Sequence, residues 1–249
     1  NVWKGMKWML KKDAPLLIRP DLDLDKAVWL TKFLWHTANN SYAKNTAATI
    51  HLGLEARRRY RNIVAKEDLK FDQTGSGILH FYKDEKYFDK ALEVQEIYQA
   101  NKCEWTMLTE AQVMKKEPAL RGVNGIIGGA WTKDDWTGDI HKFCMSLADN
   151  LKTKYGVEFH FNSKIDGLLS LHHYDKIVVA SSVGSVRLAR SIGDSLPIYP
   201  VKGYSITITA NDIKSYEAMP KVSLLDDQAK IVTSTLGNRF RVAGTAELA

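Results

Sequence analysis

The sequence lacks the features that mark several common classes of protein. Its 249 residues include only two cysteines, Cys103 and Cys144, which are far apart and show no CxxC spacing. No apolar run reaches the ~18 residues of a membrane-spanning helix, and no secretory signal opens the chain. We therefore expect a soluble, reduced protein of the cytosolic side, whose first residue, Asn1, suggests a start that was cut or processed.

The chain also lacks the short motifs of phosphate binding and of hydrolysis. Its nearest approach to a dinucleotide-binding loop, residues 75–80, has no third glycine and leads into a strand pattern. GxxxxGK[ST], HExxH and GxSxG are all missing. The neighbours His172 and His173 fit a surface turn better than a shared metal ligand set. We predict no metal site, and no dinucleotide held through either type of loop.

The charge is balanced too evenly to indicate a nucleic-acid partner. The net charge is +6, from 35 Lys+Arg against 29 Asp+Glu, and the basic residues are spread along the chain. The densest group, four arginines within residues 57–61, points in several directions on a helix. We interpret this group as a solvated helix face. With 45% hydrophobic and 26% charged residues, the composition is typical of a globular protein.

Periodicity predicts an α+β chain with one extensive sheet and flanking helices. Thr109, with Gln112 three residues on, is a candidate helix cap, and so is Thr137, with Asp139 in the following first turn. Gly237-Asn238 predicts a tight hairpin turn. The predicted helices cover residues 24–37, 46–64, 84–100, 109–116 and 138–154; extended segments or strands cover 69–72 (in a hairpin with 78–82), 125–131, 157–161, 176–180, 199–209 and 230–244.

Two groups of residues are candidates for chemistry. Asp134, Asp135 and Asp139 could act as paired carboxylates, but their context favours a loop and a helix start. In Lys202-Gly203-Tyr204, a glycine inside a strand pattern indicates either a bulge or the close approach of a ligand. Spacing alone favours the bulge, and a tyrosine hydroxyl at a pocket wall remains the alternative.

Several segments together resemble the small subunit of FAD-dependent D-amino acid dehydrogenases, within the D-amino acid oxidase-like flavoproteins. Each segment is weak alone, whereas the ordered set is specific. The matching segments are Lys7-Trp8-Met9, Ala14-Pro15-Leu16, Glu117-Pro118-Ala119-Leu120, Gly128-Gly129 through Asp135, Thr137-Gly138-Asp139, Phe143, Phe159, Phe161-Asn162, Tyr199-Pro200, Lys202-Gly203-Tyr204-Ser205, Leu225-Asp226, Arg241-Val242 and the final Gly244-Thr245-Ala246-Glu247-Leu248.

The resemblance implies a fold and a set of domains. In that family FAD lies on an N-terminal Rossmann-like domain, whose opening loop this chain lacks, and the family chain continues past Leu248. We therefore expect a fragment of the α+β substrate domain with a mixed or antiparallel sheet, plus part of the FAD-binding domain. The expected division is residues 1–155 for the substrate domain, 156–195 for the partial FAD-binding domain, and 196–249 for further strands of the substrate domain.

The resemblance also implies site residues. It places Ile165 near the FAD adenine and Ala180, Ser181, Ser182 and Gly203 beside the cofactor. It places Lys202 and Tyr204 on the substrate side, and it identifies no catalytic side chain. Three features depart from the family pattern. Ser182 replaces a frequent glycine, Ala229 and Thr235 replace tyrosine and arginine, and the segment 169–176 is short.

The implied function is oxidation of small D-amino acids such as D-alanine. Hydride transfer from the substrate to FAD yields an imine, which hydrolyses to a 2-oxo acid and ammonia. A quinone or respiratory-chain acceptor would take the electrons, which implies a cytoplasmic protein with peripheral association to the inner membrane. The fragment alone is expected to be inactive. Two alternatives stay open, namely a glycine or sarcosine oxidase and a non-catalytic binding protein derived from the fold.

Overall fold

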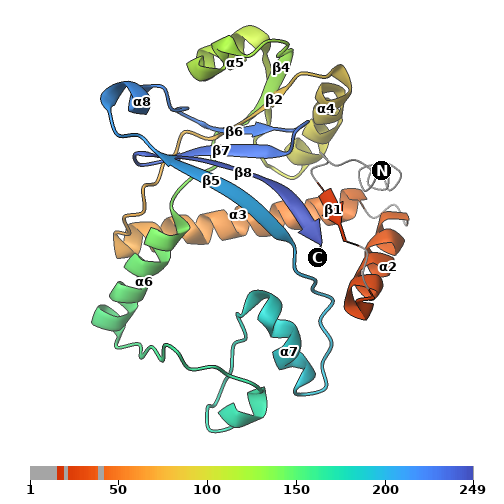
Figure 1. Cartoon of the computed structure of the whole chain (residues 1–249), viewed down its shortest axis with the longest axis vertical. Coiled ribbons are helices and arrows are strands. Elements are labelled where there is room, and N and C mark those ends of the chain that lie inside the picture. The colour runs from red at the N-terminus through yellow and green to blue at the C-terminus, as the bar shows by residue number, and fades with distance from the viewer. Residues whose placement is uncertain (1–15, 20–21, 39–41, 249) are drawn as a thin grey trace.

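The computed structural model describes residues 16–19, 22–38 and 42–248. The family-like segments Lys7-Trp8-Met9 and Ala14-Pro15 lie outside the described residues. The described chain combines one mixed sheet with flanking helices, which confirms the predicted α+β class (Figure 1). The boundaries proposed at residues 155 and 195 stay a prediction.

Eight strands form a single sheet among the described residues. Their order is β1-β8-β7-β6-β2-β4-β3, and β5 pairs with the other side of β8. The pairs β1–β8 and β2–β6 are parallel, whereas the other pairs are antiparallel. The strands are β1 (Leu16–Ile18), β2 (Ile78–Tyr82), β3 (Thr106–Thr109), β4 (Gly128–Thr132), β5 (Lys202–Thr209), β6 (Ser223–Asp226), β7 (Ile231–Leu236) and β8 (Arg239–Leu248).

The predicted helices are all present, some of them longer than expected. The capping box at Thr109 is confirmed, because its side chain accepts from the backbone of Gln112 and the Gln112 side chain accepts from the backbone of Thr109. The α-helices are α2 (Leu24–Ala38), α3 (Tyr42–Glu67), α4 (Glu85–Ala100), α5 (Glu110–Lys116), α6 (Ile140–Tyr155), α7 (Ser185–Arg190) and α8 (Ile213–Glu217); the 3-10 helices are η1 (Pro118–Gly122), η2 (Leu168–Leu171) and η3 (Ser182–Gly184).

Strand alternation sends the side chains of β2 into two separate cores. Leu79 and Phe81 pack with residues of α5 and η1 on one face of the sheet. Tyr82 belongs to a second core on the other face, with Trp105 and residues of α4. Because both faces of β2 are covered, this half of the sheet is the buried part of the molecule.

The other half of the sheet is much more open. All eight residues of β5 are exposed, among them Ile206 and Ile208. β8 lies between β5 on one side and β7, followed by β1, on the other. Leu236 ends β7 and Arg239 begins β8, so the predicted turn at Gly237-Asn238 is confirmed.

The segment expected to belong to the FAD-binding domain contains no strand. Residues 157–161 and 176–180 were predicted as strands, and both predictions are wrong for this structure. The physical reason is that no described strand lies beside them to satisfy their backbone groups. The segment instead carries the short helices η2, η3 and α7, which lie at the opposite end of the molecule from α5 (Figure 1).

Two local predictions are also wrong. Residues 69–72 form no hairpin with β2, because Leu69 and Phe71 are buried against Phe143 of α6. The cap of α6 is Asp139, whose side chain accepts from the backbone of Lys142. Thr137, the predicted cap, instead bonds the hydroxyl of Ser223 at 2.6 Å.

The arginine group on α3 is only partly a solvated face. Arg58 and Arg59 are exposed and pair with Glu55 of the same helix. Arg57 and Arg61, however, reach the loop at Asp134 and Asp135. These ion pairs agree with the interpretation that Asp134 and Asp135 are not catalytic carboxylates, since each has an arginine partner.

Glu117 is the most deeply buried carboxylate of the described chain, at 1% exposure. It accepts backbone hydrogen bonds from Ala119 at 3.0 Å, Lys221 at 2.6 Å and Val222 at 3.0 Å. Residues 117 and 221 are far apart in sequence, so one side chain joins η1 to the start of β6. A buried carboxylate is tolerated because these donors replace its lost hydration.

We predict that Glu117→Gln lowers the free energy of unfolding by about 3 kcal/mol, because the amide turns a donor toward backbone N–H groups. Urea unfolding followed by circular dichroism measures the effect. The control Glu96→Gln lies on the exposed side of α4 and should change stability by less than about 0.5 kcal/mol. Equal effects in the two variants would contradict the assigned role.

Asp139 should contribute stability that depends on pH. The hydrogen bond from Arg239, followed by that from the Lys142 backbone, lowers the pKa of Asp139 below its ordinary value of 3.8. A carboxyl with a lowered folded-state pKa stabilises the fold above about pH 4, and this contribution is lost as the pH falls through the folded pKa.

Asp139→Asn should therefore be less stable than the parent protein near pH 7, and the difference should shrink toward about pH 2.5. Asparagine is also a good helix cap, so this change isolates the charge. Unfolding curves at both pH values test the prediction, and a difference that does not depend on pH would refute it.

Candidate functional site

A β-bulge lies opposite the Lys202-Gly203-Tyr204 segment, where β5 begins. Lys202 pairs with Glu247 and Tyr204 with Gly244, and the register shifts between them. On the partner strand, Thr245 adopts a positive φ of 60°. A side chain at Gly203 would meet nothing closer than the Thr245 carbonyl at 3.7 Å. An irregularity is therefore present where it was predicted, but the extra residue lies on β8, opposite Gly203, and not on the Lys202-Gly203-Tyr204 strand.

A buried carboxylate fixes this bulge. Glu247, at 4% exposure, accepts a hydrogen bond from the Tyr204 hydroxyl. Arg19 Nε lies 2.6 Å from Oε1 of Glu247, as an ion pair without hydrogen-bond alignment. The Tyr204 bond first, and then the charges of Arg19 and Lys202, lower the pKa of Glu247. The carboxylate therefore stays ionised and accepts the Tyr204 hydrogen bond, while Lys202 lies 5.3 Å from the Tyr204 ring.

A hollow of about 380 Å³ lies beside the bulge. Its lining includes two cations, Lys230 and Arg241. Arg241 donates to Ser205 Oγ at 2.9 Å and has no carboxylate partner within the described part of the chain. The hollow is lined by Gly203, Tyr204, Ser205, Lys230, Val232, Arg241, Ala243, Gly244 and Thr245. Its donors suit an anionic group or a ring with carbonyl oxygens.

The turn between β6 and β7 holds Lys230 at this hollow. Lys230 has a positive φ of 57°, and its backbone donates to the Asp226 carbonyl at 2.8 Å. Within the same turn, Asp227 is joined to two side chains. Its Oδ2 lies 2.8 Å from His80 Nδ1 on β2, and its Oδ1 lies 3.1 Å from Lys230 Nζ.

Burial alone would raise the pKa of Asp227, but the bond to His80 and the charges of His80 and Lys230 lower it. The sequence analysis missed this pair. The two residues are 147 positions apart and meet only through the parallel pairing of β2 with β6. The one local sign that His80 has a polar partner was its position inside the apolar strand β2.

The predicted cofactor residues outside β5 do not line the hollow. The Ile165 carbonyl accepts from Arg187 at 2.8 Å, and Ala180 is exposed. The Ser181 hydroxyl contacts that of Ser185 at 3.1 Å. Ser182 has a positive φ of 52°, a conformation that favours the glycine of the family pattern. None of these residues lines the hollow, whereas Gly203 and Tyr204 do, and Lys202 lies beside them over the Tyr204 ring. Their cofactor role stays a prediction.

Comparison with known sequences gives a consistent family. The profile described as FAD dependent oxidoreductase matches residues 26–249. D-amino acid dehydrogenase 3 of Mesorhizobium japonicum is 40% identical over 263 residues, covering 99% of this chain and 63% of that protein. The D-amino acid dehydrogenase of Dechloromonas aromatica is 35% identical and covers 97% and 62%. The chain therefore spans about three fifths of the length of these relatives.

Solved structures agree on the fold. Glycine oxidase from Geobacillus kaustophilus aligns with a TM-score of 0.67 at 17% identity, covering 78% of this chain and 55% of that one. L-proline dehydrogenase from P. horikoshii aligns with a TM-score of 0.62 at 12% identity, covering 77% and 53%. At these identities the likeness concerns the fold alone. With the family profile matching nearly all of the chain, the protein belongs to the FAD dependent oxidoreductase family.

Proposed function

We propose that this chain is part of an enzyme that oxidises D-amino acids with FAD. The proposal is supported by relatives named D-amino acid dehydrogenases at 30–40% identity across nearly the whole chain. The observation that carries it structurally is the cationic hollow beside the bulge opposite Lys202–Tyr204. Because the chain spans about three fifths of these relatives, the activity is proposed for the complete gene product.

The residues at the hollow fit the expected cofactor and substrate. A flavin ring offers carbonyl oxygens and an amino acid offers a carboxylate, and both suit the donors of Lys230, Arg241 and Ser205. The small side chain of Ala243 on β8 leaves room for a flat group at the hollow. The FAD, when bound, supplies the hydride acceptor for the α-hydrogen of the substrate.

The side chains of this chain would bind and orient rather than react. Arg241 and Lys230 would hold the substrate carboxylate through charge-assisted hydrogen bonds. The Glu247–Tyr204 bond would keep the bulge, and with it Lys202, in one position. Oxidation of the neutral amine gives an imine, which water converts to the 2-oxo acid and ammonia. Neither a metal nor a nucleophilic side chain takes part in this scheme.

The complete gene product should purify with bound flavin and reduce a dye acceptor when D-alanine is added. Dye reduction without hydrogen peroxide would support a dehydrogenase, whereas peroxide formation would support the glycine or sarcosine oxidase alternative. A colourless protein that reduces no dye would support the non-catalytic alternative and would refute the proposal.

Arg241→Met should lower kcat/KM for D-alanine roughly ten- to a hundredfold, because one charge-assisted hydrogen bond is lost. The change should appear mainly as a higher KM, with kcat affected less, since the Arg241 guanidinium binds the substrate carboxylate. Arg121→Met removes an exposed arginine of η1, outside the hollow, and serves as the matched control. Unchanged steady-state kinetics in Arg241→Met would count against a carboxylate site at this hollow.

We also propose that the reduced FAD passes its electrons to a quinone or respiratory-chain acceptor and that the protein lies on the cytoplasmic face of the inner membrane. The support is an apolar face of α2, on which Leu24, Val28 and Trp35 recur at helical spacing and are 80%, 54% and 66% exposed. Within residues 16–19, 22–38 and 42–248, no helix is long and apolar enough to cross a bilayer. Any membrane contact through α2 would therefore be peripheral.

Trp35→Glu should reduce co-sedimentation with anionic lipid vesicles several-fold, because a carboxylate would enter the apolar interface. Leu92→Glu, which changes an exposed leucine of α4, should bind vesicles like the parent protein. If both variants sediment like the parent, α2 is not the membrane surface.

A further inference from the structure

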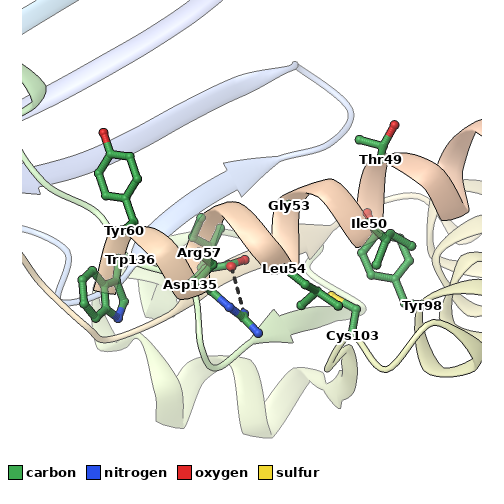
Figure 2. Close-up of a pocket in the computed structure, with 11 residues that line it drawn as sticks. Thr49, Ile50, Gly53, Leu54, Arg57, Tyr60, Tyr98, Cys103, Asp135 and Trp136 are labelled. Carbon is green, nitrogen blue, oxygen red and sulfur yellow. Dashed lines mark ion pairs between the residues drawn. The ribbon is translucent and has the colours of Figure 1, made fainter. Parts of the chain in front are cut away.

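A cavity of about 450 Å³ lies along α3, apart from the hollow at β5 (Figure 2). Its walls come from α3, the start of β2, the end of α4 and the loop that precedes α6. It shares no lining residue with the hollow beside the bulge. The cavity is lined by Thr49, Ile50, Gly53, Leu54, Arg57, Tyr60, Ile78, Tyr98, Cys103, Asp135 and Trp136.

One end of this cavity is apolar. Ile50, Leu54 and Ile78 contribute aliphatic surface, and Tyr98 contributes an aromatic ring. Burial raises the pKa of the Tyr98 hydroxyl and of the Cys103 thiol, so both groups stay uncharged at neutral pH. This end can therefore take an apolar or aromatic group without leaving a charge unpaired.

The lining of the other end includes one cation, Arg57, and one anion, Asp135, while Asp134 lies next to Arg57 outside the lining. Arg57 Nη1 lies 3.6 Å from Asp135 Oδ1, and Arg57 Nη2 lies 3.7 Å from Asp134 Oδ2. Figure 2 shows the Arg57 and Asp135 side chains pointing toward one another. At these separations the charges attract, but no hydrogen bond forms. Arg57 keeps donors for a carboxylate, and Asp135 keeps acceptor positions for an ammonium group.

The loop that bears the anion is held in place before any ligand arrives. Arg61 Nη2 donates to the Asp134 carbonyl at 2.9 Å, and its guanidinium lies 5.1 Å from the Trp136 ring. Just beyond, Thr74 and Thr137 exchange backbone hydrogen bonds of 2.8 and 3.0 Å. Because Asp135 lies on this fixed loop and Arg57 lies on helix α3, the pair loses little entropy when it binds a ligand.

Gly53 keeps the middle of the cavity open. It lies inside the long helix α3, where glycine is less favourable than alanine. A side chain added there would meet no atom within 4 Å. Helix geometry therefore does not require a glycine at this position, and a larger residue would fill the cavity rather than strain the backbone.

We propose that this cavity is a second site, which binds a zwitterionic amino acid with an apolar or aromatic side chain. The ligand carboxylate binds Arg57, its ammonium binds Asp135, and its side chain packs among Leu54, Ile78 and Tyr98. No bond is made or broken there. The site is independent of the proposed oxidation and does not need the hollow at β5.

Isothermal titration calorimetry of the protein with D- and L-phenylalanine tests the proposal. Gly53→Leu fills the cavity and should abolish the binding heat, while circular dichroism reports that the fold is kept. The matched control is Gly122→Leu, which also places a side chain in open space and should bind like the parent protein. Because Trp136 lines the cavity, ligand binding should change the tryptophan fluorescence of the protein, and Trp136→Phe should remove this change.

Ligand analogues test the charged end. Phenethylamine and 3-phenylpropionate each lack one charge of phenylalanine and should bind at least about tenfold more weakly. The second site is refuted if phenylalanine does not bind, if Gly53→Leu binds normally, or if either analogue binds as tightly as phenylalanine. It is also refuted if Arg241→Met abolishes binding while Gly53→Leu does not, since the ligand would then occupy the hollow. All of these tests measure ligand binding, and none requires the enzyme to oxidise the ligand.

Discussion

The bond between the Glu247 carboxylate and the Tyr204 hydroxyl is the interaction on which the candidate site depends. Glu247 lies near the end of β8, the strand that pairs with β1, β5 and β7. Its carboxylate also pairs with Arg19, while the Arg19 backbone donates to the Leu248 carbonyl at 3.0 Å. One buried charge thus ties three strands together and fixes the bulge of β8 that lies next to Lys202. The hollow beside it owes its shape to this arrangement.

Local structure was largely predictable, because caps and helical periods depend on neighbouring residues. The capping box at Thr109 and the turn at Gly237-Asn238 are examples. The pairing of distant strands was not predictable in the same way. His80 meets Asp227 only because β2 and β6 are parallel neighbours, and periodicity carries no information about which strands pair. The ordered family-like motifs indicated the α+β class and the family.

The segment between residues 156 and 195 shows why a correct family need not give correct elements. The apolar run 176–180 has strand character, but strand formation requires a partner for its backbone groups. No described strand is available, and Val178 is 88% exposed. The positive φ at Ser182 still agrees with the glycine of the family pattern. The cofactor residues proposed in this segment therefore rest on sequence resemblance, whereas Gly203 and Tyr204 also lie at a shaped surface.

The central claim is that the β5–β8 surface forms the wall of the flavin and substrate site. A crystal structure of the complete gene product with FAD and a substrate-like carboxylate would test it most directly. The account predicts the carboxylate within hydrogen-bond distance of Arg241 or Lys230, with the flavin ring against the hollow beside Tyr204. A flavin ring bound on another face of the sheet, with this hollow filled only by solvent, would contradict it.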